Sequence, residues 1–269
     1  MNLLEKKMLS LLKEMKENYN VTGVKAEFEA EGTRMEEAMR LKEIATRADL
    51  EVTIKVGGCE AIKDMFDAAS LGTTHLVGPM VETPYALKKY IAATKIAFRP
   101  ELRDEMEFLI NLETITACKN FDEMLKLPEA KELDGIVLGR VDLTGSMGLN
   151  RDSVNSSEIM DICVTMAAKA KEHGKKVVVG GAVSVHSLPF FKAFPAGHLD
   201  RFETRKVVFN CPGALNNTET AFLKAVEFEI MWLKNKKSHY GAIHQEDDSR
   251  LVMMEERYKR SIESISSLN

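Results

Sequence analysis

The chain has 269 residues, of which 45% are hydrophobic and 29% charged, and its formal net charge is −4. This composition is typical of a soluble globular protein, and a chain of this length can bury enough apolar surface to fold without disulfide bonds. The acidic balance, and the lack of a basic stretch interleaved with aromatic residues, argue against nucleic acid and against anionic membranes as partners.

Cysteine spacing and hydropathy indicate the compartment. The four cysteines are scattered, without a CxxC pair, so we expect buried thiols rather than disulfide bonds or a cysteine-held zinc ion. The N-terminus alternates apolar and charged residues at helical spacing, which is not the pattern of a signal peptide. No window approaches about 18 apolar residues, so we expect no membrane span. A cytoplasmic protein is the resulting expectation.

Short apolar runs rich in β-branched residues alternate with stretches of helical periodicity. The expected strands are Val21–Phe28, Glu51–Val56, Thr74–Val81, Phe108–Leu112, Gly135–Val141, Lys176–Val183 and Arg205–Asn210. The expected helices between them include Met35–Ala48, Cys59–Ser70, Tyr85–Thr94 and Glu158–His173. Strands that alternate with helices in this way predict βα units and a parallel sheet.

The glycine pattern favours a closed barrel over a doubly wound sheet. Gly57-Gly58 and Gly180-Gly181 follow strands, but neither extends into a phosphate-binding GxGxxG or GxxxxGK[ST] motif. We therefore predict an α/β fold of the TIM-type (β/α)8 class. Seven strands are visible where a barrel needs eight. Either the eighth lies within Ala196–Glu203 or the barrel is atypical at its first strand.

The C-terminal region is expected to be helical. A long helix contains the sole tryptophan, Trp232, and we expect a polar break at Ser238–Ser249 before a second helix, Arg250–Ile265. This divides the chain into a barrel domain, residues 1–237, and a C-terminal extension, residues 238–269. The apolar stripe of the second helix is consistent with packing on a neighbouring subunit of a homo-oligomer, and equally with folding back on its own barrel.

Polar residues recur at the carboxyl ends of the first five expected strands, where barrels of this type place their chemistry. They are Glu27, Glu29, Lys55, Glu82, Asn111, Glu113 and Asp142. One such acid alone is as consistent with a helix cap as with a site. Several carboxylates at one rim, however, repel one another unless a cation or a proton holds them. Oxygen ligands without His or Cys favour Mg²⁺ or Mn²⁺, so we predict a divalent ion held by two or three acids.

Three segments resemble a known family. Asn111-Leu112-Glu113-Thr114 matches a pattern of an apolar run, an amide and E-T, and Gly139–Gly148 matches a pattern close to G-x-x-D-L-S-x-S-L-G. Pro79–Thr83, which reads PMVET, matches as well. On these motifs the chain resembles the HpcH/HpaI aldolase and citrate lyase β-subunit family, within the phosphoenolpyruvate/pyruvate barrel superfamily. The resemblance extends over roughly residues 20 to 185.

The resemblance implies a metal-dependent (class II) aldolase or lyase that acts on a 2-oxo acid. In that family the residues matching Glu113 and Asp142 bind Mg²⁺ or Mn²⁺, which also chelates the carboxylate and 2-oxo oxygens of pyruvate or a related acid. Such an ion stabilises the enolate that forms when the neighbouring C–C bond breaks. For substrate binding we expect Asn111, Glu82 and the turn residues Thr144 and Gly145, whose backbone can approach a carboxylate.

Three departures from the family pattern concern the acid–base and oxyanion groups. The aldolases carry a His after an early strand, whereas Lys25–Gly32 has none. We expect Glu27 or Glu29 to handle the proton. The family's arginine at the next strand end is Lys55 here, which keeps the charge but loses the bidentate fork. Arg140 stands where the aldolases commonly have proline, so either Lys55 or Arg140 is expected to steady the oxyanion.

Two other functions are consistent with the same residues. One is an acyl-thioester lyase like the citrate lyase β-subunit, although no basic cluster suited to the phosphates of CoA is evident. The other is a barrel that binds a small metabolite without catalysing a reaction. The missing His favours the second alternative, whereas the two expected metal ligands, Glu113 and Asp142, speak against it.

Overall fold

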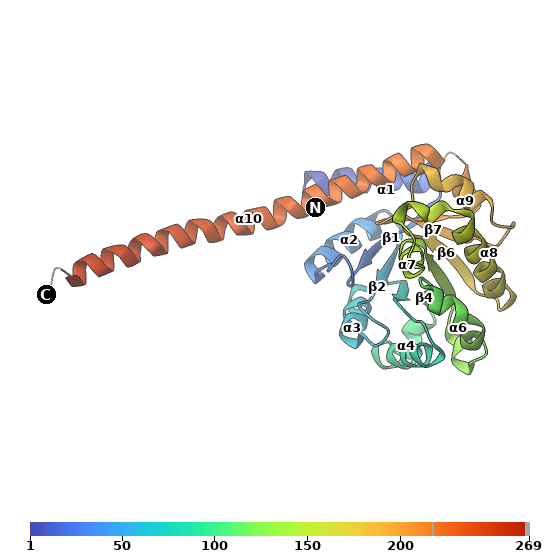
Figure 1. Ribbon diagram of the computed structural model, residues 1–269. Coiled ribbons are helices and arrows are strands. Elements are labelled where there is room, and N and C mark those ends of the chain that lie inside the picture. Colours follow the sequence, from blue (N-terminus) through green and yellow to red (C-terminus); the bar gives the residue numbers. More distant parts are fainter. Residues whose placement is uncertain (217, 267–269) are drawn as a thin grey trace.

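Eight strands close into a barrel in the computed structural model, which describes residues 1–216 and 218–266 (Figure 1). The strands are β1 (Val21–Glu27), β2 (Glu51–Lys55), β3 (His75–Gly78), β4 (Glu107–Asn111), β5 (Gly135–Gly139), β6 (Lys176–Gly180), β7 (Arg201–Glu203) and β8 (Val207–Asn210). Their order around the barrel follows the chain. The predicted TIM-type barrel is confirmed.

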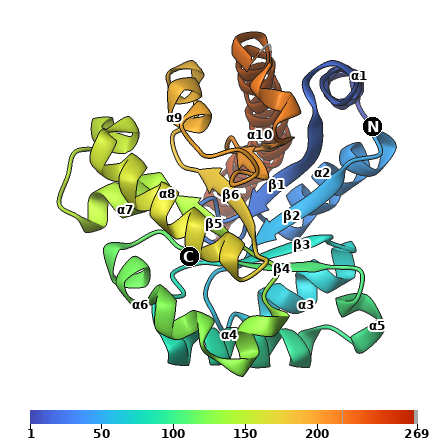
Figure 2. The same ribbon diagram turned by 90° about the vertical axis from the view of Figure 1, so that its right-hand side faces the viewer.

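Helices surround the barrel and cover the outer faces of its strands (Figure 2). They are α1 (Leu3–Tyr19), α2 (Met35–Arg47), α3 (Ile62–Leu71), α4 (Pro84–Ala97), α5 (Pro100–Arg103), α6 (Ile115–Leu125), α7 (Arg140–Ser146), α8 (Ser157–Glu172), α9 (Leu188–Lys192) and α10 (Thr218–Ser266). Short 3-10 helices are η1 (Pro128–Glu132), η2 (Arg151–Asn155), η3 (Val185–Ser187) and η4 (Gly213–Leu215). In the part of the chain that is described, none of the helices combines the length and apolar character that crossing a membrane requires.

The barrel closes through a hairpin rather than through a further parallel strand. Strands β1 to β7 pair in parallel, whereas β8 is antiparallel to both β7 and β1. Strand β7 lies within Ala196–Glu203, where the eighth strand was expected, and β8 corresponds to the expected strand Arg205–Asn210. Because β7 runs parallel to β6, the hairpin turn at residues 204–206, between β7 and β8, lies at the carboxyl end of the barrel.

Inside the barrel, an apolar layer separates two polar ends. Val77, Leu109, Val137 and Val178 form a buried cluster of their own, distinct from the core between sheet and helices. They occupy inward positions of four neighbouring strands, because side chains alternate along each strand. The polar residues that precede them in the strands and those that follow therefore face opposite mouths of the barrel.

The C-terminal region is one continuous helix, so the predicted break at Ser238–Ser249 is wrong. Helix α10 runs without interruption from Thr218 to Ser266 and projects from the barrel (Figure 1). The polar stretch contains no proline, and it carries ion pairs one helical turn apart, His244–Asp248 and Glu246–Arg250. Pairs at this spacing support a helix, so polarity here indicates solvent exposure rather than a loop.

Candidate active site at the carboxyl end of the barrel

A cavity of about 650 Å³ opens at the carboxyl ends of the strands. Of the described residues that line it, seven are Asp or Glu and four are Lys or Arg. Six of the residues predicted from sequence contribute to it: Glu27, Glu29, Lys55, Asn111, Glu113 and Asp142. The structure therefore brings together four of the predicted acids, the amide and the lysine in one place.

Glu113 is a buried acid of this cavity and follows β4 by two residues. Its side chain accepts a hydrogen bond from Asn111 Nδ2 at 2.5 Å and one from the backbone N–H of Met80 at 3.1 Å. Burial raises the pKa of Glu113, although the Lys55 ammonium acts in the opposite direction. Gly139 makes room for it, because a Cβ there would stand 2.7 Å from the Glu113 side chain. The carboxylate is thus fixed in position, and a nearby cation favours its charged form.

Asp142 lies on a helix and not at a strand end. Strand β5 stops at Gly139, and Asp142 belongs to the first turn of α7, where its side chain is exposed. Its charge acts on Glu113, adding to the rise of that residue's pKa. The expectation of a strand reaching Val141 was therefore wrong, because the chain begins to coil directly after the glycine.

The donor set suits a hard divalent cation. Among the described residues, no three His, Cys, Asp or Glu side chains form a group that could hold a metal ion. Glu113 and Asp142 provide two carboxylates, and the buried Asn111 Oδ1 has no hydrogen-bond partner. A buried polar atom without a partner is costly, and a bound cation or its water would satisfy it. These three residues fit an oxygen-ligated ion completed by substrate or water.

Buried lysines form ion pairs with glutamates in the lining of the cavity. Lys25 pairs with Glu203 at the end of β7 and, at 3.0 Å, with Glu27. Burial acts to lower the pKa of Lys25, but the two carboxylates outweigh it and raise the pKa above its usual range. Lys55 Nζ lies 2.8 Å from Glu29 Oε2, and its pKa is raised in the same way.

Lys25 and Glu203 are functional candidates that the sequence reasoning missed. Lys25 stands at an inward position of β1, two residues before Glu27. A charged residue within an apolar run is the feature of the sequence that could have identified it. Glu203 gave no comparable signal, because its place at the rim depends on the closing hairpin. The hairpin also supplies Lys206, a buried lysine that pairs with Glu31 and whose pKa burial lowers.

Arg140 does not face the cavity, contrary to its predicted role beside the oxyanion. Its side chain is fully buried and donates hydrogen bonds to the carbonyl oxygens of Gly180, at 3.1 Å, and Gly181, at 2.7 Å. It also donates to Asn155 Oδ1 at 2.6 Å, and its guanidinium lies 4.7 Å from the ring centre of Phe190. Because Arg140 starts a helix rather than continuing β5, its side chain points into the outer layer. Burial lowers the pKa of Arg140 to about 10.

Three predicted substrate-binding residues also lie outside the lining of the cavity. Glu82 accepts a hydrogen bond from Thr114 Oγ1 and is engaged between two loops. Thr144 is fully buried and donates to the backbone oxygen of Arg140 at 2.6 Å. Gly145 is exposed on α7. The segment 144–148 forms the end of a helix and not an open glycine-rich turn, so its amides are largely engaged in helical hydrogen bonds.

Comparison with protein families matches residues 30–184 to the HpcH/HpaI aldolase/citrate lyase family. This segment spans β2 to β6 and includes Lys55, Asn111, Glu113 and Asp142. A comparison with curated protein sequences finds no match.

Solved structures with the same fold include members of that family. An HpcH/HpaI aldolase from Desulfitobacterium hafniense DCB-2 is 13% identical, with a TM-score of 0.60, 76% of this chain covered and 82% of the other. A family protein from Burkholderia cenocepacia J2315 is 14% identical, with a TM-score of 0.59 and coverages of 74% and 82%. The citrate synthase SbnG is 15% identical, with a TM-score of 0.56 and coverages of 69% and 78%. At these identities the likeness concerns the fold alone.

Proposed function

Because the chain belongs to the HpcH/HpaI aldolase/citrate lyase family, we propose that it is a divalent-metal-dependent carbon–carbon lyase acting on a 2-oxo acid. Proteins of this family are lyases and aldolases and are generally dependent on a divalent metal ion. The observation that carries the proposal is the cluster of Glu113, Asp142 and the unpartnered Asn111 Oδ1 at the carboxyl end of the barrel. Mg²⁺ and Mn²⁺ are the ions that such oxygen donors prefer.

Each residue of the site has a distinct part in the proposal. Glu113 and Asp142 hold the ion, which supplies Lewis-acid polarisation of the substrate's 2-oxo group. Lys55 provides a fixed positive charge next to Glu113, where it stabilises negative charge that develops on the substrate oxygen. Asn111 orients a ligand through its free amide oxygen.

The acid–base group is assigned to Glu29 rather than Glu27. Lys25 lowers the pKa of Glu27, although burial opposes this, so Glu27 is a weak base. Glu29 Oε2 is buried and lies 2.8 Å from Lys55 Nζ. In the cleavage direction, Glu29 accepts the hydroxyl proton of a 4-hydroxy-2-oxo acid as the C3–C4 bond breaks. The carbonyl product leaves, and the protonated Glu29 returns the proton to C3 of the remaining enolate, which gives the 2-oxo acid.

The apolar wall of the cavity supports an acyl-thioester lyase as a second candidate. Val183, Val185, Leu223 and Val226 are among the residues that line the cavity. Leu223 is 68% exposed and Val226 49% exposed, so both remain available to a ligand. An acyl chain or the arm of a thioester would bury this surface, as would the apolar half of an aldol substrate.

Calorimetric titration of chelator-treated protein with Mn²⁺, with and without oxalate, tests the metal site. Oxalate presents the paired oxygens of a 2-oxo acid enolate, so we expect about one Mn²⁺ per chain and at least tenfold tighter binding with oxalate. Asp142→Asn should abolish this binding. Asp152→Asn, another exposed aspartate near the same rim, is the matched control and should bind normally. Failure of wild-type protein to bind Mn²⁺ would overturn the proposal.

Substrate assays then separate the two lyase candidates. Release of a 2-oxo acid from 4-hydroxy-2-oxo acids, followed with a coupled dehydrogenase, is expected for the first. Cleavage of an acyl-CoA with no action on free hydroxy-oxo acids would instead identify the protein as an acyl-thioester lyase. Binding of both Mn²⁺ and oxalate without turnover of either substrate class would favour a non-catalytic metabolite-binding barrel.

A further inference from the structure

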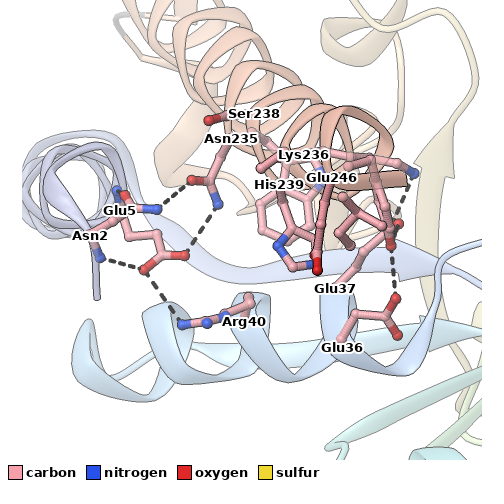
Figure 3. A pocket seen from close by; sticks show the side chains of 14 residues that line it. Asn2, Glu5, Glu36, Glu37, Arg40, Asn235, Lys236, Ser238, His239 and Glu246 are labelled. Carbon is pink, nitrogen blue, oxygen red and sulfur yellow. Dashed lines mark hydrogen bonds and ion pairs between the residues drawn. The ribbon is translucent and has the colours of Figure 1, made fainter. Parts of the chain in front are cut away.

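Polar contacts hold α10 against α1 and α2 where the helix leaves the barrel (Figure 3). Lys236 Nζ lies 2.9 Å from Glu37 Oε2, and the Tyr240 hydroxyl donates to Glu37 Oε1 at 2.7 Å. Asn235, the residue directly before Lys236, donates from Nδ2 to Glu5 Oε1 at 3.2 Å. The polar groups therefore bind α10 to α1 and α2 up to Tyr240, and they fix the direction in which the helix continues.

Beyond Tyr240 the helix extends away from the barrel (Figure 1), after a first turn in which Ala242, Ile243 and Glu246 still line a pocket shared with α1 and α2. Every side chain from Gly241 to Glu263 is exposed, and the ion pairs of this part, such as Glu246–Arg250, join residues of the same helix. We call residues 241–263 the arm. At 1.5 Å per residue the arm is roughly 34 Å long. Isolated helices gain little stability in water, so an arm of this length indicates a partner that packs against it.

One face of the arm carries an exposed stripe suited to helix packing. The residues follow one another at spacings of three or four, which places them on one side of a helix. They are Ile243, Asp247, Leu251, Met254, Tyr258 and Ile262. Apart from the aspartate, their exposed fractions lie between 46% and 67%. An exposed helix face that is apolar apart from one acid is typical of an interaction surface.

The stripe is symmetric about a point between Val252 and Met253. Along the sequence, the members of three pairs lie equally far from that point on its two sides. The pairs are Leu251 and Met254, Asp247 and Tyr258, and Ile243 and Ile262. Two copies of the arm that pack antiparallel around this point would therefore bring apolar residues onto apolar residues. The one acid of the stripe would face the one phenol, whose O–H can donate to the carboxylate.

The charges of the arm select the antiparallel direction. Acidic residues occupy positions 246–248, Glu246, Asp247 and Asp248, and basic residues occupy positions 257, 259 and 260, Arg257, Lys259 and Arg260. The two groups lie at nearly equal distances from the centre of symmetry. An antiparallel pair places each acidic segment beside a basic one, whereas a parallel pair would place like charges together.

We propose that the arm is a self-association surface whose occupant is the arm of a second copy of this chain, packed antiparallel about the point between Val252 and Met253. Leu251 and Met254 form the centre of the contact. Asp247 accepts a hydrogen bond from Tyr258 of the partner subunit on either side of it. The pairing leaves the mouth of each barrel open, since it involves only residues of the arm.

Sedimentation of two neighbouring methionine variants tests the proposal. Met254→Asp changes the stripe, whereas Met253→Asp changes a residue about 100° around the helix with similar exposure, 57% against 53%. We expect wild-type protein and Met253→Asp to be dimeric at micromolar concentrations, and Met254→Asp to dissociate at least tenfold more readily. Neither residue contacts the barrel, so both variants should keep the wild-type melting temperature of the barrel. A monomeric wild type, or equal behaviour of the two variants, would overturn the proposal.

Disulfide trapping tests the direction of the pair. Ile243→Cys and Ile262→Cys proteins are prepared separately, then mixed and oxidised under mild conditions, with wild type as the control for the four native cysteines. The antiparallel pair predicts a cross-linked dimer in the mixture and little in either variant alone. Cross-linking within each single variant would indicate a parallel pair. Sedimentation as a dimer without any cross-link would indicate that the arm binds a neighbouring barrel instead, and both results contradict the proposal.

Discussion

Lys55 Nζ lies 3.4 Å from Glu113 Oε2, so a buried ammonium stands beside the carboxylate that is assigned to the metal. The same nitrogen lies 2.8 Å from Glu29 Oε2. One lysine therefore links the acid that would hold the ion to the acid that would move the proton. This arrangement has a cost for cation binding, because the ammonium and the ion repel each other.

Lys55→Met should separate metal binding from turnover. Removal of the positive charge is expected to tighten Mn²⁺ binding severalfold, since a competing cation disappears next to Glu113. Turnover of the 2-oxo acid substrate should fall at least a hundredfold, because the developing oxyanion loses its fixed charge. Titration with Mn²⁺ and steady-state rates measure the two effects. Lys63→Met, at an exposed lysine on α3, should change neither; weaker Mn²⁺ binding in Lys55→Met would show that the lysine supports the ion.

Arg140→Ala should destabilise the protein strongly while Mn²⁺ binding survives in the folded fraction. The substitution leaves the carbonyl oxygens of Gly180 and Gly181 without their donor and opens a cavity beside Phe190. A loss of about 3–5 kcal/mol in the free energy of unfolding is expected. Urea denaturation measures it, and Arg151→Ala, an exposed arginine on η2, should change stability by less than about 0.5 kcal/mol. Full stability combined with lost turnover would restore Arg140 as an oxyanion group.

Glu107→Gln should reduce stability in a pH-dependent way at the amino end of the barrel. Glu107 contacts Arg201 and Lys176, and its Oε2 lies 3.3 Å from His75 Nε2. Burial acts to raise its pKa, but these three groups outweigh burial and hold the pKa of Glu107 below its usual range. The carboxylate therefore contributes stability above the unfolded-state pKa of about 4.3, and this contribution is lost as the pH falls further.

The measurement for Glu107→Gln is urea denaturation at several pH values. At pH 7 we expect the free energy of unfolding of the variant to be about 2 kcal/mol below that of wild type. The difference should be similar at pH 5 and should shrink below about pH 4. Glu101→Gln removes an acid from an exposed pair with Arg99 and serves as the control, with an expected effect below about 0.5 kcal/mol. A deficit that grows toward acid pH would contradict the assigned contacts.

Gly181→Ala should be far more damaging than Gly174→Ala. Both glycines have positive φ, +83° and +70°, which costs a residue with a side chain roughly 1–2 kcal/mol. A Cβ at Gly181 would also stand 2.8 Å from the backbone nitrogen of Val141, whereas nothing lies within 4 Å of one at Gly174. We expect the free energy of unfolding to fall by more than about 3 kcal/mol in Gly181→Ala and by about 1 kcal/mol in Gly174→Ala. Equal losses in thermal unfolding would show that the loop after β6 can move away from α7.

Local sequence patterns predicted most of the barrel. The errors arose where the same pattern is compatible with two different structures. Gly135–Val141 was expected to be a single strand because its apolar run continues through Val141, yet the chain coils from Arg140 onward, where the guanidinium finds buried carbonyl acceptors. The polar stretch Ser238–Ser249 was expected to break a helix, because polarity marks loops and solvated helices alike. The strand-end acids were found because alternation and strand boundaries are local properties.

The sequence by itself determined the alternation of strands and helices, the barrel class and the family, as well as the placing of Glu113, Lys55 and Asn111 at strand ends. These follow from periodicity and from short motifs, which involve residues close together in the chain. Only the tertiary structure decided that Lys25 meets Glu203, that β8 closes the barrel in the antiparallel sense and that Arg140 turns away from the cavity. Each of these depends on contacts between residues far apart in the chain, whose energies no local pattern records.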